Sequence, residues 1–149
     1  MDRIDRHILQ VLQADATVSV QGVGDRVGLS HNACWRRIKR LEEAGIIRKR
    51  VALVDPKQVG YGVTVFVTVR TSHHTEDWLE RFATGVAALP EVMEFYRLSG
   101  DTDYLLKVLV ADIAEYDRFY KKLIRIAPLY DVSSSFAMEQ VKYTTEIPV

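Results

Sequence analysis

Residues 30–41, Ser-His-Asn-Ala-Cys-Trp-Arg-Arg-Ile-Lys-Arg-Leu, decide the fold of the first part of the chain. Ser30 is a good helix N-cap, because its hydroxyl can accept a hydrogen bond from a free amide of the first helical turn. Cys34, Ile38 and Leu41 then follow at i, i+4 and i+7, which places three apolar side chains on one helix face. Gly28, just before the cap, is the residue type that ends a helix in the left-handed conformation. The sequence therefore predicts two helices joined by a short turn, a helix-turn-helix.

Two helices are expected before this turn. The first starts at the acidic pair Asp2 and Asp5 and repeats apolar residues at helical spacing up to Leu12. The second is capped by Ser19 and has valines on one face. Two glycines weaken the second helix, although a glycine such as Gly24 also lets a neighbouring helix pack closely.

The second helix of a helix-turn-helix is the one presented to the major groove of DNA. On the opposite side of its apolar stripe we expect an asparagine, which can read adenine, and outward-facing arginines, which can read guanine. Gly45 ends this helix, and the extended segment 46–51 adds three cations that suit a wing along the phosphate backbone. The alternative is a three-helix domain with a solvated basic face. The residues predicted to contact double-stranded DNA are Ser30, His31, Asn32, Arg36, Arg37, Lys39, Arg40, Arg48, Lys49 and Arg50, with Arg36, Arg37 and Arg40 facing outward.

Two side chains near the stripe have alternative interpretations. Cys34 is a packed thiol or a redox sensor, and its place on the apolar stripe favours packing. Trp35 follows the stripe by one residue and either packs at the edge of the core or leans on the DNA backbone. We favour the core position for Trp35.

Composition limits the classes of protein that remain. The chain of 149 residues has a formal net charge of zero, but residues 1–50 hold ten Lys and Arg against six Asp and Glu, a local charge of +4. The single cysteine excludes an internal disulfide and cannot form a thiolate metal site alone. The sequence has no apolar run of membrane-spanning length and no signal-peptide pattern, so we expect a cytoplasmic protein without membrane contact.

The rest of the chain changes to a period of two. Residues 1–51 are predicted to form the DNA-binding domain, 52–62 a linker and 63–149 a second domain. The second domain has strands at 63–70, 91–99, 104–110 and 131–145, and helices that start after Thr75 and Asp112. This order is βαββαβ, a ferredoxin-like α+β fold with both helices on one face of the sheet. A partner subunit is the simplest cover for the other face, so we expect a homodimer with two recognition helices one DNA turn apart. The residues expected on that second face are Phe66, Met93, Phe95, Leu105 and Leu109.

Several strings in order now resemble one family, the leucine-responsive/asparagine-regulator (Lrp/AsnC, feast/famine) transcription factors, along essentially the whole chain. The strings are Ile4-Asp5, Ile8-Leu9, Val27-Gly28-Leu29-Ser30, Cys34 to Leu41, Glu43-Ala44-Gly45-Ile46-Ile47, Gly100-Asp101-Thr102-Asp103-Tyr104 and Lys142-Tyr143-Thr144-Thr145-Glu146-Ile147-Pro148. The sequence departs from the family at His31 and Ala33, where prolines are common, which puts an inherited DNA preference in doubt.

The resemblance implies a bacterial or archaeal transcription regulator whose dimers assemble into octamers around DNA. It also implies an amino-acid effector bound between dimers near the β-hairpin turn, where carboxylates can meet an ammonium group and turn amides or hydroxyls a carboxylate. The residues implied for the effector are Gly100, Asp101, Asp103, Tyr104, Ser133, Ser134 and Ser135.

Two other functions are alternatives to this one. An enzyme built on the ferredoxin-like domain is disfavoured, because the sequence has no phosphate loop, no nucleophile elbow and no spaced metal ligands beside the adjacent pair His73 and His74. We therefore expect no catalytic residues, no metal and no cofactor. An architectural protein that binds DNA without an effector is the second alternative, and a search for ligand-induced stabilisation separates it from a sensor.

Overall fold

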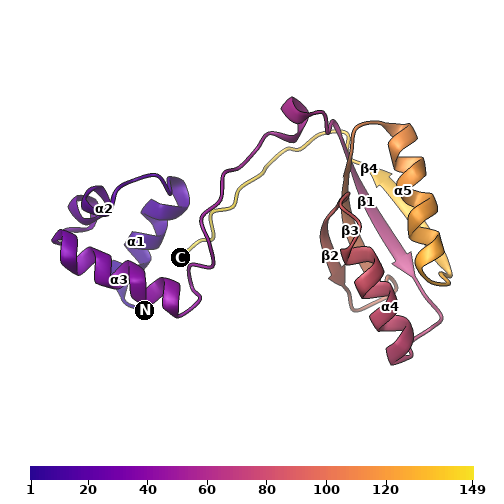
Figure 1. The fold of residues 1–149 in the computed structure, drawn as a ribbon, viewed down its shortest axis with the longest axis horizontal. Helices are drawn as coiled ribbons and strands as arrows, with labels where there is room; N and C mark the ends of the chain where they lie inside the picture. Colours follow the sequence, from indigo (N-terminus) through magenta and orange to yellow (C-terminus); the bar gives the residue numbers. More distant parts are fainter. The chain divides into compact units, whose positions relative to one another are not determined.

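The computed structural model describes residues 1–149 and divides the chain into two units. One unit contains Met1–Leu53 together with Val141–Val149, and the other contains Val54–Gln140. Figure 1 shows three helices in the first unit and a sheet with two helices in the second. The first unit is therefore built from both the beginning and the last residues of the chain.

The first unit is a three-helix domain made of α1 (Arg3–Ala14), α2 (Val20–Val27) and α3 (His31–Glu43). Each predicted cap is present. The side chain of Asp2 accepts from the Asp5 amide at α1, and Ser19 and Ser30 cap α2 and α3. Gly28 ends α2 with a φ of 74°, in the left-handed region. The buried apolar side chains of this unit are Ile8, Leu9, Val11, Leu12, Val23, Cys34, Ile38 and Leu41.

Close packing at the turn explains the glycine inside α2. A Cβ atom on Gly24 would lie 2.7 Å from the carbonyl oxygen of Leu29 and 3.5 Å from Cβ of Cys34. The Leu29 amide also donates to the Gly24 carbonyl over 2.9 Å. Cys34 is fully buried, and burial raises the pKa of its thiol, which agrees with a packed side chain.

The cationic segment after α3 is irregular chain. Residues 48–55 form neither strand nor helix. A short 3-10 helix, η1 (Pro56–Val59), follows and is capped by Asp55.

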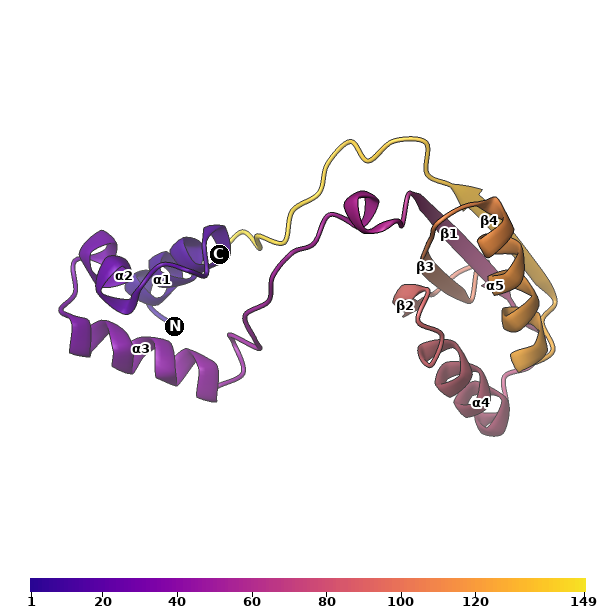
Figure 2. The same ribbon diagram turned by 45° about the horizontal axis from the view of Figure 1, so that its top comes forward.

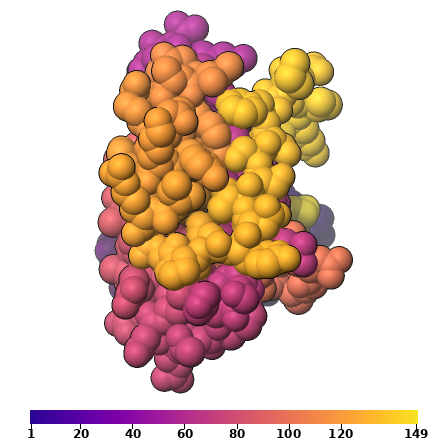
Figure 3. Space-filling view, turned by 90° about the vertical axis from the view of Figure 1, so that its right-hand side faces the viewer, coloured from indigo at the N-terminus to yellow at the C-terminus, as the bar shows by residue number.

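The second unit is a four-stranded antiparallel sheet of order β2-β3-β1-β4. Its elements are β1 (Val63–Arg70), α4 (Glu76–Ala87), β2 (Val92–Arg97), β3 (Tyr104–Val110), α5 (Ile113–Ile126) and β4 (Asp131–Phe136). Figure 2 shows α4 and α5 on one side of the sheet, and Figure 3 shows α5 (orange) beside β4 (yellow) on the surface. The predicted βαββαβ order and the single helical layer are confirmed. The core between sheet and helices is formed by Val65, Val67, Val69, Trp78, Phe82, Val86, Tyr104, Leu106, Val108, Val110, Tyr116, Phe119, Leu123 and Ala127.

The other face of the sheet has no helix, and we call it the open face. Phe66, Leu105 and Leu109 alternate with core residues and therefore lie on the open face, and Met93 is exposed beside a β-bulge. The prediction for Phe95 is wrong. Its register partner is Leu106 of the core, and its ring meets Phe82 of α4 edge to face, because the bulge shifts the alternation in β2.

None of the helices is long and apolar enough to cross a membrane.

Candidate functional site

The helix-turn-helix fixes where α3 begins and which side it leaves open. The Ser30 hydroxyl accepts from the Ala33 amide over 3.4 Å and so acts as the cap. Cys34, Ile38 and Leu41 are buried against α1 and α2. Some polar side chains of α3 therefore contact residues at the start of α1, and the others are exposed to solvent.

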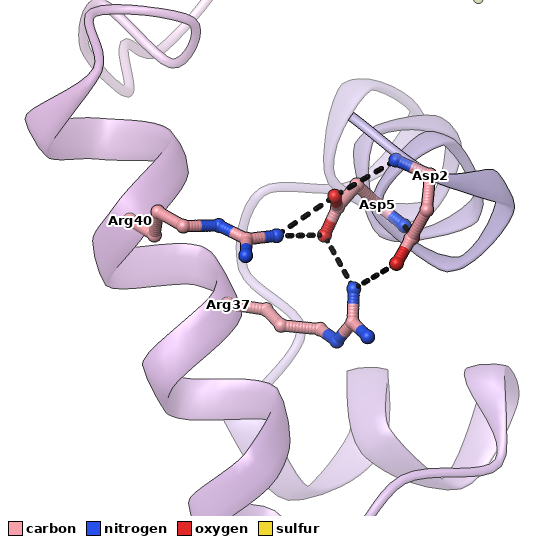
Figure 4. Close-up of polar contacts among 4 residues, drawn as sticks. All are labelled: Asp2, Asp5, Arg37 and Arg40. Carbon is pink, nitrogen blue, oxygen red and sulfur yellow. Dashed lines mark hydrogen bonds and ion pairs between the residues drawn. The ribbon is translucent and has the colours of Figure 1, made fainter.

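Two of the predicted DNA contacts turn toward α1 (Figure 4). Arg37 donates from Nη1 to Asp2 Oδ2 over 2.7 Å and to Asp5 Oδ1 over 2.9 Å. Arg40 donates from Nη2 to Asp5 Oδ2 over 2.8 Å. The prediction that Arg37 faces outward is wrong. Its side chain is only 26% exposed and is paired with Asp5, whose side chain is 1% exposed. Arg40 shares the same carboxylate but keeps 62% of its side chain exposed.

The electrostatics of this cluster favour the charged forms. The Asp5 amide and the Arg37 guanidinium hold the pKa of Asp2 at about 2, below its ordinary value of 3.8. Burial acts to raise the pKa of Asp5, but the Asp2 amide and Arg37 outweigh burial and lower that pKa. The two carboxylates in turn raise the pKa of Arg37. The cluster of Asp2, Asp5, Arg37 and Arg40 thus joins α1 to α3. The acidic start of α1 was visible in the sequence, but its partners lie more than thirty residues further on.

On the outward side of α3 lie Asn32, Trp35, Arg36 and Lys39, which are exposed and which we call the solvent face of α3; Glu43 is exposed at the end of the same helix. Neither Arg36 nor Lys39 takes part in an ion pair of the domain. His31, also exposed, has Nδ1 3.4 Å from Oδ1 of Asn32. The prediction that Trp35 packs at the core edge is wrong, because 48% of Trp35 is exposed. One residue beyond Cys34 is a rotation of about 100°, which carries Trp35 off the buried stripe.

The cationic segment after α3 is exposed as expected, but one of its residues is paired. Arg50 donates to Glu42 of α3 over 3.1 Å. Arg48 and Lys49 are exposed. The helix α3 exposes the Asn32 amide and two cations without ion-pair partners, and the segment after it exposes Arg48 and Lys49. These side chains are the hydrogen-bond donors that phosphates and base edges require.

The residues implied for an effector fall into two groups on the sheet. Gly100, with a φ of 113°, and Asp101 are exposed at the turn between β2 and β3. Asp103 accepts from the Thr71 amide over 2.8 Å, so its carboxylate holds the turn to the end of β1. Tyr104 is buried among the rings of Trp78, Phe82 and Phe95. Asp101 is therefore the exposed carboxylate of the turn.

The three serines of β4 lie across β1 from this turn. Ser133 pairs in register with Thr68, which pairs with Leu105 on its other side. Ser134 faces the helices, where its hydroxyl is hydrogen bonded to the Tyr116 hydroxyl, whereas Ser133 and Ser135 are exposed. The turn and the serines do not converge on one pocket in a single chain. No group of three or more His, Cys, Asp or Glu gathers as a metal site.

Comparison with family models covers nearly the whole chain. Residues 1–48 match the winged helix-turn-helix DNA-binding model, and residues 64–147 match the Lrp/AsnC ligand-binding domain.

Relatives and solved structures agree with these matches. The DNA-binding transcriptional activator DecR of Escherichia coli K12 is 50% identical over 150 residues, which cover 100% of this chain and 99% of the relative. An AsnC-family transcriptional regulator from Agrobacterium tumefaciens is 58% identical with a TM-score of 0.96, over 99% of this chain and 97% of that one. A transcriptional regulator from Neisseria meningitidis, solved as an L-Met complex, is 37% identical with a TM-score of 0.94, over 99% of this chain and 96% of that one.

Proposed function

The chain belongs to the Lrp/AsnC family of transcriptional regulators, and on that basis we propose that it binds specific DNA sequences in response to an amino acid. The observation that carries the DNA half is the solvent face of α3, where Asn32, Arg36 and Lys39 are exposed and the two cations are free of internal ion pairs. Asparagine and arginine are the side chains that read adenine and guanine in the major groove. A regulator of this kind acts at the chromosome, so we also propose a cytoplasmic location.

The arginines of α3 provide a matched test of this proposal. Arg36→Ala removes an open cation, so specific DNA binding should weaken by about 1–3 kcal/mol while the unfolding temperature stays unchanged. Arg37→Ala removes a partner of Asp2 and Asp5, so it should lower the unfolding temperature in addition to weakening DNA binding. Fluorescence anisotropy on a selected site and thermal unfolding measure the two effects. Wild-type affinity in Arg36→Ala would count against the assignment of this face to DNA.

Contact with the phosphates by the segment after α3 is tested separately. Lys49 is exposed, and each phosphate contact adds a released counterion to the binding equilibrium. In Lys49→Ala, the plot of log affinity against log salt should therefore flatten by about one unit. Arg50→Ala is the comparison, because Arg50 is already paired with Glu42 and its loss should change the slope less. A wild-type slope in Lys49→Ala would remove the segment from the interface.

We propose that the amino-acid effector binds where copies of the chain meet. The L-Met in the Neisseria meningitidis structure supports an amino acid as the chemical class, without identifying which one binds here. The separation of the β2–β3 turn from the β4 serines across β1 supports a site that another copy must complete. Asp101 is the carboxylate we expect to meet the ammonium group, since Asp103 already accepts from Thr71.

The effector is found by screening free amino acids for a rise in unfolding temperature. A ligand at one hundred times its dissociation constant stabilises the native state by about 2.7 kcal/mol. Asp101→Ala should abolish the shift without changing the unfolding temperature of the free protein. If the wild-type protein binds DNA but no amino acid raises its unfolding temperature, the effector-independent architectural function is favoured instead.

We further propose that the open face of the sheet is the dimer interface, and that dimers assemble into octamers. Phe66, Leu105 and Leu109 supply an apolar surface on a sheet face that carries no helix. Phe66→Glu should give a monomer in sedimentation velocity, because the new charge would be buried between two sheets. Ile113→Glu, at an exposed apolar position at the start of α5, should sediment as wild type. Unchanged assembly of Phe66→Glu would place the dimer interface elsewhere.

A further inference from the structure

Trp35 is an exposed aromatic side chain without a ring partner. It is 48% exposed, whereas Trp78, the other tryptophan, is 6% exposed in the core of the α+β unit. The ring pairs of that unit do not include Trp35. The ring therefore contributes little to the core of the three-helix domain.

The neighbours of Trp35 on α3 are polar. Asn32 lies three residues before it and Lys39 four residues after it, the spacings that make side chains adjacent on a helix surface. Arg36 is adjacent to Asn32 and Lys39 by the same rule. The solvent face of α3 thus combines one large apolar ring with an amide and two cations.

This combination matches the chemistry of the major groove of DNA. Phosphates line both sides of the groove and attract cations, base edges offer donors and acceptors, and the thymine 5-methyl group is the apolar feature of the groove floor. Trp35 is the fifth residue of α3, in the N-terminal half that contacts base edges in helix-turn-helix proteins. A tryptophan side chain has two rotatable bonds, so it presents a large contact area at a low entropy cost.

We propose that Trp35 contacts the 5-methyl group of a thymine and so requires a thymine at a fixed position of each half-site. The inference rests on the proposed function, because it needs α3 to lie in the major groove. Arg36 and Lys39 hold the helix at the phosphates or at guanine, and the Trp35 ring covers the methyl group between them.

The experiment compares thymine with deoxyuridine, which lacks only the methyl group. A site is first selected from random duplexes with the wild-type full chain, and each thymine of that site is then replaced singly. We expect one replacement in each half-site to weaken wild-type binding about fourfold, the effect of losing one buried methyl group. Trp35→Ala should weaken binding to the thymine site about tenfold and bind thymine and deoxyuridine sites equally. Trp35→Phe, which keeps a ring, should retain the preference for thymine.

The outcomes separate this inference from the proposed function. If the wild-type chain selects no sequence, the proposed function fails and the inference fails with it. If the wild type selects a site but Trp35→Ala keeps the same thymine preference, only the inference is overturned. A third outcome is that deoxyuridine does not weaken wild-type binding while Trp35→Ala binds every sequence more weakly. This result would place the ring on the sugar-phosphate backbone and also overturn the methyl contact. Thermal unfolding of both variants should match wild type, because Trp35 is outside the core.

Discussion

At the scale of single residues, Gly24 sets how closely the turn can approach α2. A methyl group there would meet the backbone oxygen of Leu29 at 2.7 Å, and that oxygen belongs to the turn itself. Alanine would add up to about 1 kcal/mol of helix propensity. We expect the clash to dominate, so that Gly24→Ala destabilises the three-helix domain by about 1–3 kcal/mol. Hydrogen exchange of the α2 and α3 amides in the full chain measures the loss.

Gly22 on the same helix is the matched control. A Cβ atom there would lie 3.0 Å from Cγ1 of Val18 and 3.3 Å from Oγ of Ser19, which are side-chain rather than backbone atoms. Val18 can rotate, so Gly22→Ala should change stability by less than about 0.5 kcal/mol. Equal protection of the two alanine variants would show that the turn is not limited by the close approach at Gly24.

Prediction from sequence reached its limit at Arg37 and Trp35. The caps and the stripe of α3 are local patterns, so the helix and its buried side followed directly from Ser30 and Cys34. The orientation of Arg37 depends on Asp5, which is 32 residues away and becomes a neighbour only after α1 packs on α3. Trp35 was expected at the edge of the core because it follows the apolar stripe by one residue, but its helical phase places it outside the buried stripe.

At the scale of elements, the carboxylates of α1 hold α3 in place. Asp5 is almost fully buried and satisfies both Arg37 and Arg40. Asp5→Asn removes the charge and turns an acceptor-only group into one with two donors facing guanidiniums. We expect a loss of about 2 kcal/mol at neutral pH, moderated because both arginines keep contact with water. Urea unfolding followed by circular dichroism measures it, and an unchanged midpoint would mean that the pairs are not stabilising.

The same carboxylates predict the response of the domain to acid. The pKa of Asp2 is about 2 in the folded chain and 3.8 for the free side chain, and that of Asp5 is also lowered. A lowered pKa stabilises the fold above the unfolded value, and this stabilisation disappears as the pH falls through the folded value. Stability should therefore be lost between about pH 4 and pH 2. In an Asp2→Asn/Asp5→Asn variant this loss should be smaller, with the remainder from groups of the same domain such as Asp15, whose pKa the Thr17 hydroxyl and amide lower. An identical acid profile in this variant would exclude the α1 carboxylates as its cause.

The strands show which part of the sheet could be predicted from alternation alone. Alternation predicted β1 and β3 correctly, because these two strands pair with each other along nearly their whole length. It overextended the last strand, since β4 ends at Phe136 and the Ala137 amide makes a final bond to Thr64. β1 begins at Val63, which lies opposite Met138 in this register, so residues beyond Met138 have no β1 residues left to pair with. A strand ends where its partner ends, and no pattern within residues 131–145 contains that information.

At the scale of the whole molecule, the chain returns to the three-helix domain after the sheet is complete. Residues 141–149 belong to the same unit as α1, α2 and α3. The Gln13 side chain donates to the Ile147 carbonyl over 3.1 Å and accepts from the Ile147 amide over 2.7 Å. Gln10 donates to the Val149 carbonyl over 2.9 Å. The sequence assigned this segment to the second domain, because side-chain amides that bind a distant backbone leave no periodic signal.

These bonds give the final prediction, which concerns how firmly the last residues are held to α1. Gln13→Ala removes both hydrogen bonds to Ile147, which together contribute about 1–2 kcal/mol. The Ile147 amide should then exchange with solvent about 5–30 times faster, while the amides of the sheet keep their wild-type rates. Gln21→Ala is the control, because the Gln21 amide bonds only to Asp25 within α2. Equal exchange at Ile147 in the wild type and Gln13→Ala would mean that Gln13 does not hold the segment, whereas faster exchange in Gln13→Ala alone would identify Gln13 as the side chain that holds residues 141–149 to α1 within their unit.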